Sequence, residues 1–331
     1  MVKHYTNFNI KKLHRGSIIL IGNFDGLHLG HQKLFQLAQS YKKKYNLKIG
    51  VVNFDPMPKM FFNKKLKNFR LSNIDQKIKL LSNLKVDFVI TKKFDKKFSK
   101  TKALNFISQI LNKKLGSKFI FVSNNFRFGN KRKGNVSLLK KLGKKYNYRL
   151  IKVSPYKHQN TIISSSRIRK YLQRGSLDLA NKLLSRTWFI EGDVIKGKGR
   201  GRKLGYRTCN IKIKNYVLPK FGIYAVRVSI KNQKKLYNGI SYIGSRPTFK
   251  EKGIILETYI LGIKKNLYQK RLKIYFLKFL RKDKKFKNSE KLVEQMNKDL
   301  IYAKKGLKRK LILWAKKILI YPKLHFQWRP I

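Results

Sequence analysis

The stretch IGNFDGLHLGHQKLFQLA, from Ile21 to Ala38, joins an apolar run to an amphipathic segment. The apolar run, Ser17–Ile21, is short enough for a fully buried strand, and apolar residues recur at helical spacing from Gln32 onward. Residues 22–31 are therefore expected to turn from a strand into a helix. Such a turn directs free backbone N–H groups and the positive end of a helix at one point, which suits a phosphate group.

The residues inside this turn favour a ligand site. Gly22, Gly26 and Gly30 allow the backbone to approach a ligand closely. His28 and His31 are three positions apart, so a helical first turn places them on one face. The alternative is a capped helix with two surface histidines. The coincidence of strand, glycines, histidines and helix favours the site.

The composition indicates a chain with two folded cores and no disulfide framework. At 331 residues, with 42% hydrophobic residues, two domains are expected rather than one. Cys209 is the single cysteine, which excludes a cysteine-based zinc site and fits a reducing, cytoplasmic environment. No apolar run reaches membrane-spanning length, and we expect no signal peptide.

The formal net charge of +67 raises the alternative of a nucleic-acid-binding protein. Lysine is spread along the whole chain, however, and no recognition helix, zinc finger or aromatic RNA-binding strand is found. We therefore expect no specific nucleic-acid partner, and weak, salt-sensitive adhesion to polyanions on charge alone. The sequence does not indicate an oligomeric state.

The two halves of the chain differ in the rhythm of their predicted elements. Up to about Leu184, short apolar strands alternate with helical stretches, which indicates a parallel sheet with helices on both faces. From Thr187 onward, six strands follow one another with short links, which favours a small closed barrel. A helix is expected over Ser289–Lys305. The expected domains are residues 1–184 and 185–305, followed by a basic tail, 306–331.

Several polar or glycine-containing segments follow predicted strands of the first half. Ligands of an open parallel sheet bind beyond the carboxyl ends of its strands. FDPMPKMFF (Phe54–Phe62) and VSNNFRFGNKRKG (Val122–Gly134) lie at such ends, and ISSSRIRKYL (Ile163–Leu172) enters the last helix of this half. Serines at a helix start are ordinarily caps. Every member of this set, however, offers phosphate donors or flat apolar surface, so together they predict a nucleotide site.

At these residues the chain resembles the prokaryotic bifunctional riboflavin kinase/FMN adenylyltransferases, also called FAD synthetases. GNFDGLHLGH resembles the family's adenylyltransferase signature, G-x-F-D-G-x-H-x-G-H, and ISSSRIR resembles its second nucleotide motif. GKGRGRKLGYRTCN (Gly197–Asn210) resembles the kinase motif G-x-x-x-G-R-x-L-G-x-P-T-A-N, and ISYIGSRPTF and LETYIL resemble the segments that follow it. The resemblance runs from about Ser17 to Lys304. It implies a Rossmann-like nucleotidyltransferase domain of α/β class, then a six-stranded antiparallel β-barrel kinase domain with a C-terminal helix.

The resemblance implies an enzyme that phosphorylates riboflavin to FMN with ATP and then adenylylates FMN to FAD, releasing pyrophosphate. The adenylyl transfer needs positioning and charge stabilisation more than a covalent intermediate. The implied catalytic residues of this step are His28 and His31. The implied contacts to ATP and its phosphates are Gly22, Asn23, Asp25, Gly30, Ser164, Ser165 and Arg169. The implied flavin contacts are Pro56, Pro58, Phe62, Asn125 and Arg127.

The kinase half has no Walker A pattern, so a P-loop kinase is excluded. Its glycine-rich loop is expected to bind phosphates through backbone N–H groups. The implied ATP contacts of this loop are Gly197, Gly201, Arg202 and Gly205. The resemblance assigns Mg²⁺ to Thr208 and Asn210, whose oxygens suit a hard cation, and the general base to Glu257.

One departure from the kinase motif leaves alternatives open. Arg207 stands where the family motif has proline, which would fix the backbone before Thr208. One alternative is therefore an FMN adenylyltransferase with a kinase-impaired barrel that only binds flavin. Another is a nucleic-acid-binding protein on a nucleotidyltransferase scaffold. The implied partners of the main interpretation are the small molecules ATP, riboflavin and FMN.

Overall fold

The computed structural model describes residues 2–158, 161–197, 201, 204–213, 215–245, 254–263 and 265–318. The chain forms two compact units, which are treated separately below. Unit 1 comprises Met1–Arg174, Leu179–Arg186 and Lys214–Leu218, and unit 2 comprises Gly175–Asp178, Thr187–Ile213 and Pro219–Ile331. Unit 1 is thus discontinuous along the chain, because it includes a short segment from the second half.

Unit 1 is built on a six-stranded parallel sheet with the strand order β1-β4-β3-β2-β5-β8. Its strands are β1 (Lys3–Tyr5), β2 (Ile18–Ile21), β3 (Ile49–Asp55), β4 (Phe88–Lys93), β5 (Phe119–Ser123) and β8 (Arg149–Val153). Strand β2 is central, so the loop after it lies between the loops after β3 and β5. The predicted parallel sheet is confirmed, with the edge strand β1 added.

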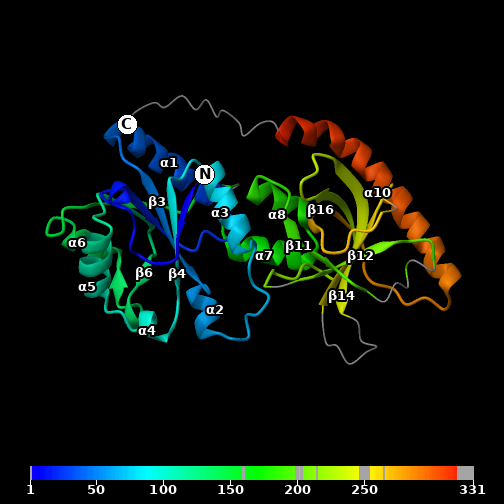
Figure 1. The fold of residues 1–331 in the computed structure, drawn as a ribbon, viewed down its shortest axis with the longest axis horizontal. Coiled ribbons are helices and arrows are strands. Elements are labelled where there is room, and N and C mark those ends of the chain that lie inside the picture. Colours follow the sequence, from blue (N-terminus) through cyan, green and yellow to red (C-terminus); the bar gives the residue numbers. More distant parts are fainter. Residues whose placement is uncertain are drawn as a thin grey trace. The chain divides into compact units, whose positions relative to one another are not determined.

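Helices cover both faces of this sheet (Figure 1). On one face lie α1 (Leu29–Tyr45) and α3 (Ile74–Asn83), and on the other lie α5 (Ala103–Asn105), the π-helix η2 (Phe106–Lys114) and α6 (Val136–Leu142). Alternate strand residues separate the two cores. Leu20 and Val51 pack on the α1 and α3 side, whereas Ile19 and Val52 pack on the η2 and α6 side.

The remaining elements of unit 1 are short or follow the sheet. They are η1 (Lys12–His14), α2 (Pro58–Phe62), α4 (Lys96–Ser99), β6 (Arg127–Phe128), η3 (Asn130–Arg132), β7 (Gly134–Asn135), β9 (Lys157–His158), β10 (Thr161–Ile162), α7 (Ser165–Arg174) and most of α8 (Leu177–Leu184), whose first two residues are assigned to unit 2. The pairs β6–β7 and β9–β10 are small antiparallel ribbons. Helix α2 directly continues from β3, at the carboxyl edge of the sheet.

Unit 2 is a closed antiparallel barrel with the strand order β11-β12-β15-β14-β13-β16. Its strands are β11 (Phe189–Ile195), β12 (Thr208–Lys212), β13 (Gly222–Ile230), β14 (Leu236–Ser245), β15 (Ile254–Ile260) and β16 (Arg271–Arg281). Trp188, Tyr224 and Phe276 are large side chains of its core, each at most 1% exposed. The predicted six-stranded barrel is confirmed.

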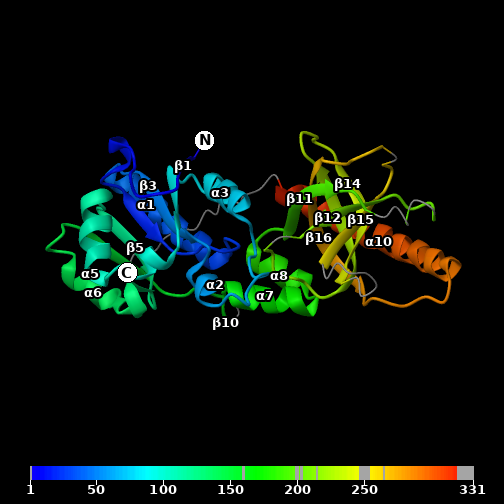
Figure 2. The ribbon, with the colours of Figure 1, turned by 60° about the horizontal axis from the view of Figure 1, so that its bottom comes forward.

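One long helix, α10 (Ser289–Ile318), lies beside the barrel (Figure 2). Leu300 and Ala303 pack against Ala225 and Ile240 of the barrel wall. The helix was expected to end near Lys305, but it continues through the following glycine to Ile318. A single glycine costs about 1 kcal/mol relative to alanine inside a helix, which is too little to end a long one. None of the described helices is long and apolar enough to cross a membrane.

The segment Lys214–Leu218, which lies between β12 and β13 in the chain, packs into unit 1. The carbonyl of Asn215 accepts a hydrogen bond from the N–H of Arg70, at 2.9 Å, and the N–H of Val217 donates to the carbonyl of Arg70, at 2.7 Å. The Tyr216 hydroxyl accepts a hydrogen bond from the Asn73 side chain, at 2.8 Å. Tyr216 and Val217 are both buried, so this segment completes the core of unit 1.

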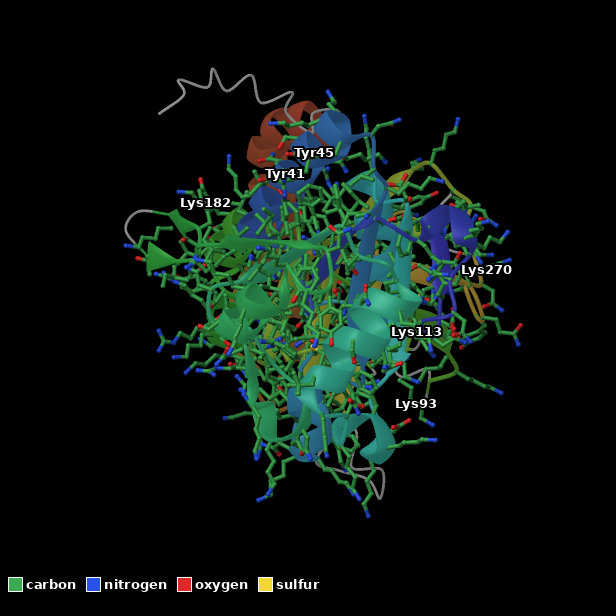
Figure 3. The ribbon with its side chains drawn as sticks, turned by 90° about the vertical axis from the view of Figure 1, so that its left-hand side faces the viewer. Tyr41, Tyr45, Lys93, Lys113, Lys182 and Lys270 are labelled. Atoms are coloured by element: carbon green, nitrogen blue, oxygen red, sulfur yellow. The ribbon has the colours of Figure 1, made fainter. Side chains whose placement is uncertain are left out.

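Lysine side chains extend outward from many elements (Figure 3). The four that Figure 3 labels, Lys93, Lys113, Lys182 and Lys270, come from β4, η2, α8 and the turn before β16. The described part of the chain therefore distributes positive charge over elements of both units. Screening by salt is strong for such exposed charges.

Val217→Ala should destabilise unit 1 rather than the barrel. The Val217 side chain is 1% exposed, and burial of its two lost methyl groups is worth about 2 kcal/mol. The measurement is hydrogen exchange of the full chain, followed by mass spectrometry of peptides from each unit. Faster exchange is expected in the strands β2 to β5. The matched control, Val226→Ala in the core of β13, should instead loosen the barrel peptides. Faster exchange of barrel peptides alone in Val217→Ala would contradict the assignment of this segment to unit 1.

Candidate active sites

The turn after β2 places two histidines at the start of α1. The helix begins at Leu29, three residues before the Gln32 start expected from apolar spacing, and His28 is its N-cap. The Nδ1 atom of His28 accepts a hydrogen bond from the backbone N–H of His31, at 3.4 Å. Neutral His28 therefore carries its proton on Nε2. The two rings are stacked, with centroids 3.7 Å apart.

This turn uses a strained backbone. Phe24 and Leu27 have φ angles of 44° and 42°, in the left-handed region that side chains other than glycine rarely adopt, and Gly26 has a φ of 78°. Such conformations persist when the surroundings fix them, and they are common at ligand sites. Phe24 is 3% exposed, so its ring helps to hold the turn in the core of the α1 face.

A buried ion pair between Asp25 and Arg169 fixes the base of the turn. The Asp25 carboxylate accepts hydrogen bonds from the backbone N–H groups of Leu71, at 3.0 Å, and Ser72, at 3.3 Å, and from the Arg169 guanidinium. Arg169 also donates from Nε to the carbonyl of Phe69, at 2.7 Å, and lies over its ring. In this structure the two side chains thus join the turn after β2 to helix α7 and to the segment before α3. Their expected contacts with phosphates stay a prediction.

The start of α7 lies against this turn. The Ser165 hydroxyl donates to the backbone carbonyl of Asp25, at 2.8 Å, and Ser164 caps the helix by accepting from the N–H of Arg167, at 3.2 Å. A Cβ placed on Gly30 would lie 3.7 Å from the carbonyl of Ile163 and 3.3 Å from the His28 ring. A side chain at position 30 would therefore press on the His28 ring, and the Ser165 hydrogen bond is what brings the two predicted phosphate segments together.

Burial controls the charge of the two histidines. Desolvation, helped by the positive charge of Arg186, lowers the pKa of His28 to about 4. Desolvation, followed by the charges of His28 and Lys77, lowers the pKa of His31 well below its usual value. Both rings are therefore neutral at pH 7, and they can act as N–H donors rather than as cations.

The predicted flavin residues lie on both sides of the turn. Pro58 is at the first turn of α2, after β3, and Phe62 at its end is 71% exposed and packs edge-on against Phe94. Asn125, which accepts from the Ser123 hydroxyl at 3.0 Å, and Arg127 follow β5 and are exposed. Because β3 and β5 flank β2, the structure places these two groups either side of the histidines. Pro56, Gly22 and Asn23 also lie in loops at this carboxyl edge.

The structure adds buried polar groups that the sequence analysis missed. Lys77, on the sheet-facing side of α3, is 5% exposed, and Asn53, near the end of β3, is 1% exposed. Arg70 forms an ion pair with Asp55 at the same edge of the sheet. The sequence signal for the burial of Lys77 is its position in the helical pattern, four residues before Leu81, where an apolar residue is expected. Because lysine is abundant throughout the chain, this one did not stand out.

The kinase residues lie on the outer face of the barrel. Asn210 pairs with Glu257 across β12 and β15, and Thr208 pairs with Tyr259. The alternate residues of β15, Leu256 and Thr258, are buried in the core. The Thr208 hydroxyl donates to a carboxylate oxygen of Glu257, at 2.7 Å. These predicted residues therefore form one group on neighbouring strands.

Two described glycines of the glycine-rich segment, Gly197 and Gly201, lie close to this group. A Cβ on Gly197 would lie 2.1 Å from the Asn210 amide nitrogen, and one on Gly201 would lie 2.4 Å from the carbonyl of Tyr206 and 3.2 Å from the Thr208 hydroxyl. Glycine is thus required for the backbone to approach the two strand residues. Gly205 has a φ of 80° and is exposed. Arg202 and most of the SRPTF segment lie outside the described residues.

The donor set of this group suits a hard cation that a nucleotide helps to hold. Thr208 and Asn210 offer a hydroxyl and an amide oxygen, and the Glu257 carboxylate is adjacent. Within the described ranges there is no cluster of three or more His, Cys, Asp and Glu side chains that could hold a metal by itself. Phosphate and water oxygens would have to complete the coordination.

Two family models match successive parts of the chain. The family model of FAD synthetase matches residues 10–167, and the model of riboflavin kinase matches residues 184–307. A protein of Buchnera aphidicola (from Schizaphis graminum) named bifunctional riboflavin kinase/FMN adenylyltransferase is 41% identical over 300 residues, which are 90% of this chain and 96% of that protein. The protein of the same name from Escherichia coli K12 is 34% identical over 289 residues, 87% of this chain and 92% of the other.

A solved structure is similar to this chain over most of its length. It is a crystal structure from Streptococcus pneumoniae, named a macrolide-efflux protein, with a TM-score of 0.81 and 26% identity. The match covers 92% of this chain and 98% of that one. The two family models and the curated relatives carry the assignment, and the chain belongs to the bifunctional riboflavin kinase/FMN adenylyltransferase family.

Proposed function

We propose that this chain phosphorylates riboflavin to FMN with ATP and then transfers an adenylyl group from a second ATP to FMN, forming FAD and pyrophosphate. The observation that carries the proposal is that two separate groups of polar residues, one in each unit, match the two chemistries. Unit 1 presents N–H donors where the first turns of α1 and α7 lie close together. Unit 2 presents a strand carboxylate beside a hydroxyl and an amide group, with two glycines close to them.

In the adenylyl transfer, a phosphate oxygen of FMN attacks the α-phosphorus of ATP, and the bond to the β-phosphate breaks. Negative charge then moves onto the leaving pyrophosphate. His28 donates from Nε2, and the free N–H groups at the start of α1 lie beside it. The start of α7, with Ser164 and Ser165, faces the same turn. Preorganised donors of this kind stabilise developing charge without reorganisation.

The roles proposed for the remaining residues of unit 1 follow from their positions. Gly22, Asn23 and Gly30 shape the turn around the triphosphate, and Asp25 and Arg169 hold that turn. Pro56, Pro58, Phe62, Asn125 and Arg127 would contact the flavin. The exposure of Phe62 at the edge of the sheet supports a stacking surface for the isoalloxazine ring.

In the kinase step, the 5′-hydroxyl of riboflavin attacks the γ-phosphorus of ATP, and the bond from that phosphorus to the β-phosphate oxygen breaks, which releases ADP. Glu257 would accept the hydroxyl proton, since it is the carboxylate beside the proposed phosphate loop. The hydrogen bond from Thr208 orients that carboxylate. Gly197, Gly201, Arg202 and Gly205 would contact the phosphates of ATP.

We infer that Mg²⁺ is the metal of this site, held by Thr208, Asn210 and oxygens of ATP. When bound, the ion supplies positive charge to the transferred phosphoryl group. We also infer that the adenylyltransferase activity belongs to residues 1–184 together with the Lys214–Leu218 segment. The kinase activity then belongs to residues 185–305, with 306–331 outside both activities.

The alternative of a kinase-impaired barrel rests on Arg207. This residue is exposed, and the Thr208–Glu257 hydrogen bond next to it is formed without a proline. The discriminating experiment incubates the protein with riboflavin, ATP and Mg²⁺ and separates FMN and FAD by chromatography over time. Appearance of FMN before FAD is expected. FAD from supplied FMN, with no FMN from riboflavin, would instead support the kinase-impaired alternative.

His28→Ala and His31→Ala should each slow FAD formation from FMN by about 10²–10³-fold, because each removes a preorganised donor to the phosphates. FMN formation from riboflavin should stay at the parent rate, since the barrel is unchanged. The measurement is the initial rate of each reaction with purified protein. His4→Gln, at the edge strand β1, is the control and should keep both rates. A parent rate of FAD formation in either alanine variant would remove that histidine from the mechanism.

Glu257→Gln should reduce FMN formation by about 10²–10⁴-fold, the usual contribution of a general base. Riboflavin binding, followed by fluorescence quenching, should change little because the amide has the size of the carboxylate. The control is Glu191→Gln, which removes a carboxylate that pairs with Arg271 elsewhere on the barrel. If Glu257→Gln binds riboflavin normally and forms FMN at the parent rate, the hydroxyl proton must be accepted by water or by ATP instead of Glu257.

Asn210→Ala should raise the Mg²⁺ concentration needed for half-maximal kinase rate about tenfold, because one oxygen ligand is lost. Cys209→Ala is a matched control, since Cys209 is the neighbour on β12 and pairs with the core-facing Thr258. Titration of Mg²⁺ at fixed ATP gives the half-maximal Mg²⁺ concentration of each variant. An unchanged Mg²⁺ requirement in Asn210→Ala would exclude Asn210 as a ligand.

A further inference from the structure

Both backbone groups of Arg70 are bound by a segment from the second half of the chain. The Arg70 N–H donates to the carbonyl of Asn215, at 2.9 Å, and its carbonyl accepts from the N–H of Val217, at 2.7 Å. Arg70 thereby pairs with the buried Tyr216 as a parallel β-bridge. Because these two bonds hold the peptide groups on either side of the Arg70 Cα atom, they fix the point from which its side chain starts.

The Arg70 side chain reaches the end of β3. Its guanidinium donates to the Asp55 carboxylate, in an ion pair whose arginine side chain is 12% exposed and whose aspartate side chain is 31% exposed. The backbone carbonyl of Asp55 accepts from the N–H of Phe94, at 2.9 Å. Pro56, which follows, has no N–H with which to continue the strand. Asp55 is therefore the residue at which β3 releases the chain into the proposed flavin segment.

That segment, Pro56–Phe62, has a fixed point at each end. Asp55 precedes it, and at its end the Phe62 ring packs edge-on against Phe94, with ring centroids 5.9 Å apart. Met57, within the segment, is buried. A shift of Asp55 would move the two prolines relative to the aromatic end. Because isoalloxazine is a rigid ring system, its proposed contacts at both ends must keep a fixed separation.

We propose that Arg70 is a positioning residue for the FMN side of the adenylyl transfer, and that the Asn215–Val217 segment fixes Arg70 for this task. This segment lies in the part of the sequence that matches the riboflavin kinase model, residues 184–307, although it belongs to unit 1. A stretch of the kinase half thus serves the other activity. The proposal rests on the adenylyl transfer and the flavin contacts proposed above.

The contacts of the next two residues confine the effect to the FMN side. The N–H groups of Leu71 and Ser72 bind the Asp25 carboxylate, which Arg169 also holds. Removal of the Arg70 side chain leaves these backbone bonds in place. The histidine turn, and with it the binding of ATP, should therefore keep its geometry.

The first test removes the ion pair from either side. Arg70→Met and Asp55→Asn should each raise the KM for FMN about tenfold in FAD formation from supplied FMN. This is the lower end of the range for a hydrogen bond between charged groups, because the pair is partly exposed. The KM for ATP should stay within about twofold of the parent value. The double variant should be no worse than either single variant, because both act by loss of the same contact.

The matched control is an ion pair at the opposite end of the same strand. Lys42 pairs with Asp87, whose carboxylate accepts from the N–H of Ile49, the first residue of β3. Lys42→Met should therefore leave both KM values unchanged. FMN formation from riboflavin should stay at the parent rate in all of these variants, since the barrel is untouched.

The second test asks whether the segment acts through Arg70. Tyr216→Ala should raise the KM for FMN about threefold in the parent, a usual size for such indirect coupling, and should cause no further rise in the Arg70→Met background. A purely structural role for Tyr216 would lower stability or rate equally in both backgrounds. If Tyr216→Ala does not fold, Tyr216→Phe removes only the hydroxyl that binds Asn73 and is compared in the same way.

Three results would overturn the proposal. Additive effects of Arg70→Met and Asp55→Asn would mean that Arg70 acts without Asp55. An equal rise of both KM values would mean a general loosening of unit 1. A further rise caused by the Tyr216 variant in the Arg70→Met background would mean that the segment does not act through Arg70.

A readout without catalysis separates this proposal from the proposed function. Hydrogen exchange of peptides covering residues 54–63 should be faster than in the parent for Arg70→Met and for the Tyr216 variant, and unchanged for Lys42→Met. If the parent forms no FAD from FMN, the proposed function fails, while exchange still decides whether Arg70 holds this segment. Unchanged exchange in folded Arg70→Met would overturn the positioning role.

Discussion

The carboxylate of Asp25 is the group on which the arrangement of unit 1 depends. It receives a guanidinium from α7 and two backbone N–H groups from the segment before α3, so one side chain joins three parts of the chain that are distant in sequence. Loss of one partner from such a buried pair typically costs about 3–5 kcal/mol, because the other charge stays buried. The strained backbone at Phe24 and Leu27 persists because this network fixes the residues around it.

Much of the fold could be predicted from local patterns, and less of the site could be. The central strand, the strand-to-helix turn and the six barrel strands follow from apolar runs and their spacing. The start of α1 was placed too late because its cap, His28, precedes the apolar repeat. The pairing of Asp25 with Arg169 has no local signature, since it forms only when α7 folds back onto the turn. Lys77 was missed because burial, which distinguishes it from the other lysines, is a property of the fold.

The two sites use backbone and charge in different ways. In unit 1, neutral rings and helix N–H groups are the donors proposed for the phosphates, while Arg169 is paired with the protein's own carboxylate. In unit 2, a carboxylate and the two proposed oxygen ligands lie on the outer barrel wall, and glycine at positions 197 and 201 allows the backbone to approach them closely. The large positive charge of the surface lies apart from this chemistry. It attracts anionic nucleotides over distances that salt shortens.

The Lys214–Leu218 segment has a consequence for how the protein folds during its synthesis on the ribosome. Translation is vectorial, and the first unit is usually able to fold as soon as its last residue emerges. Here that residue is not Arg186 but Leu218, roughly 30 residues later, which at about 5–20 residues per second is a delay of about 2–6 s. During that interval Arg70 and Asn73 lack the hydrogen bonds that they form with the segment around Tyr216 and Val217. Two strands of the barrel, β11 and β12, must therefore be synthesised before unit 1 is complete.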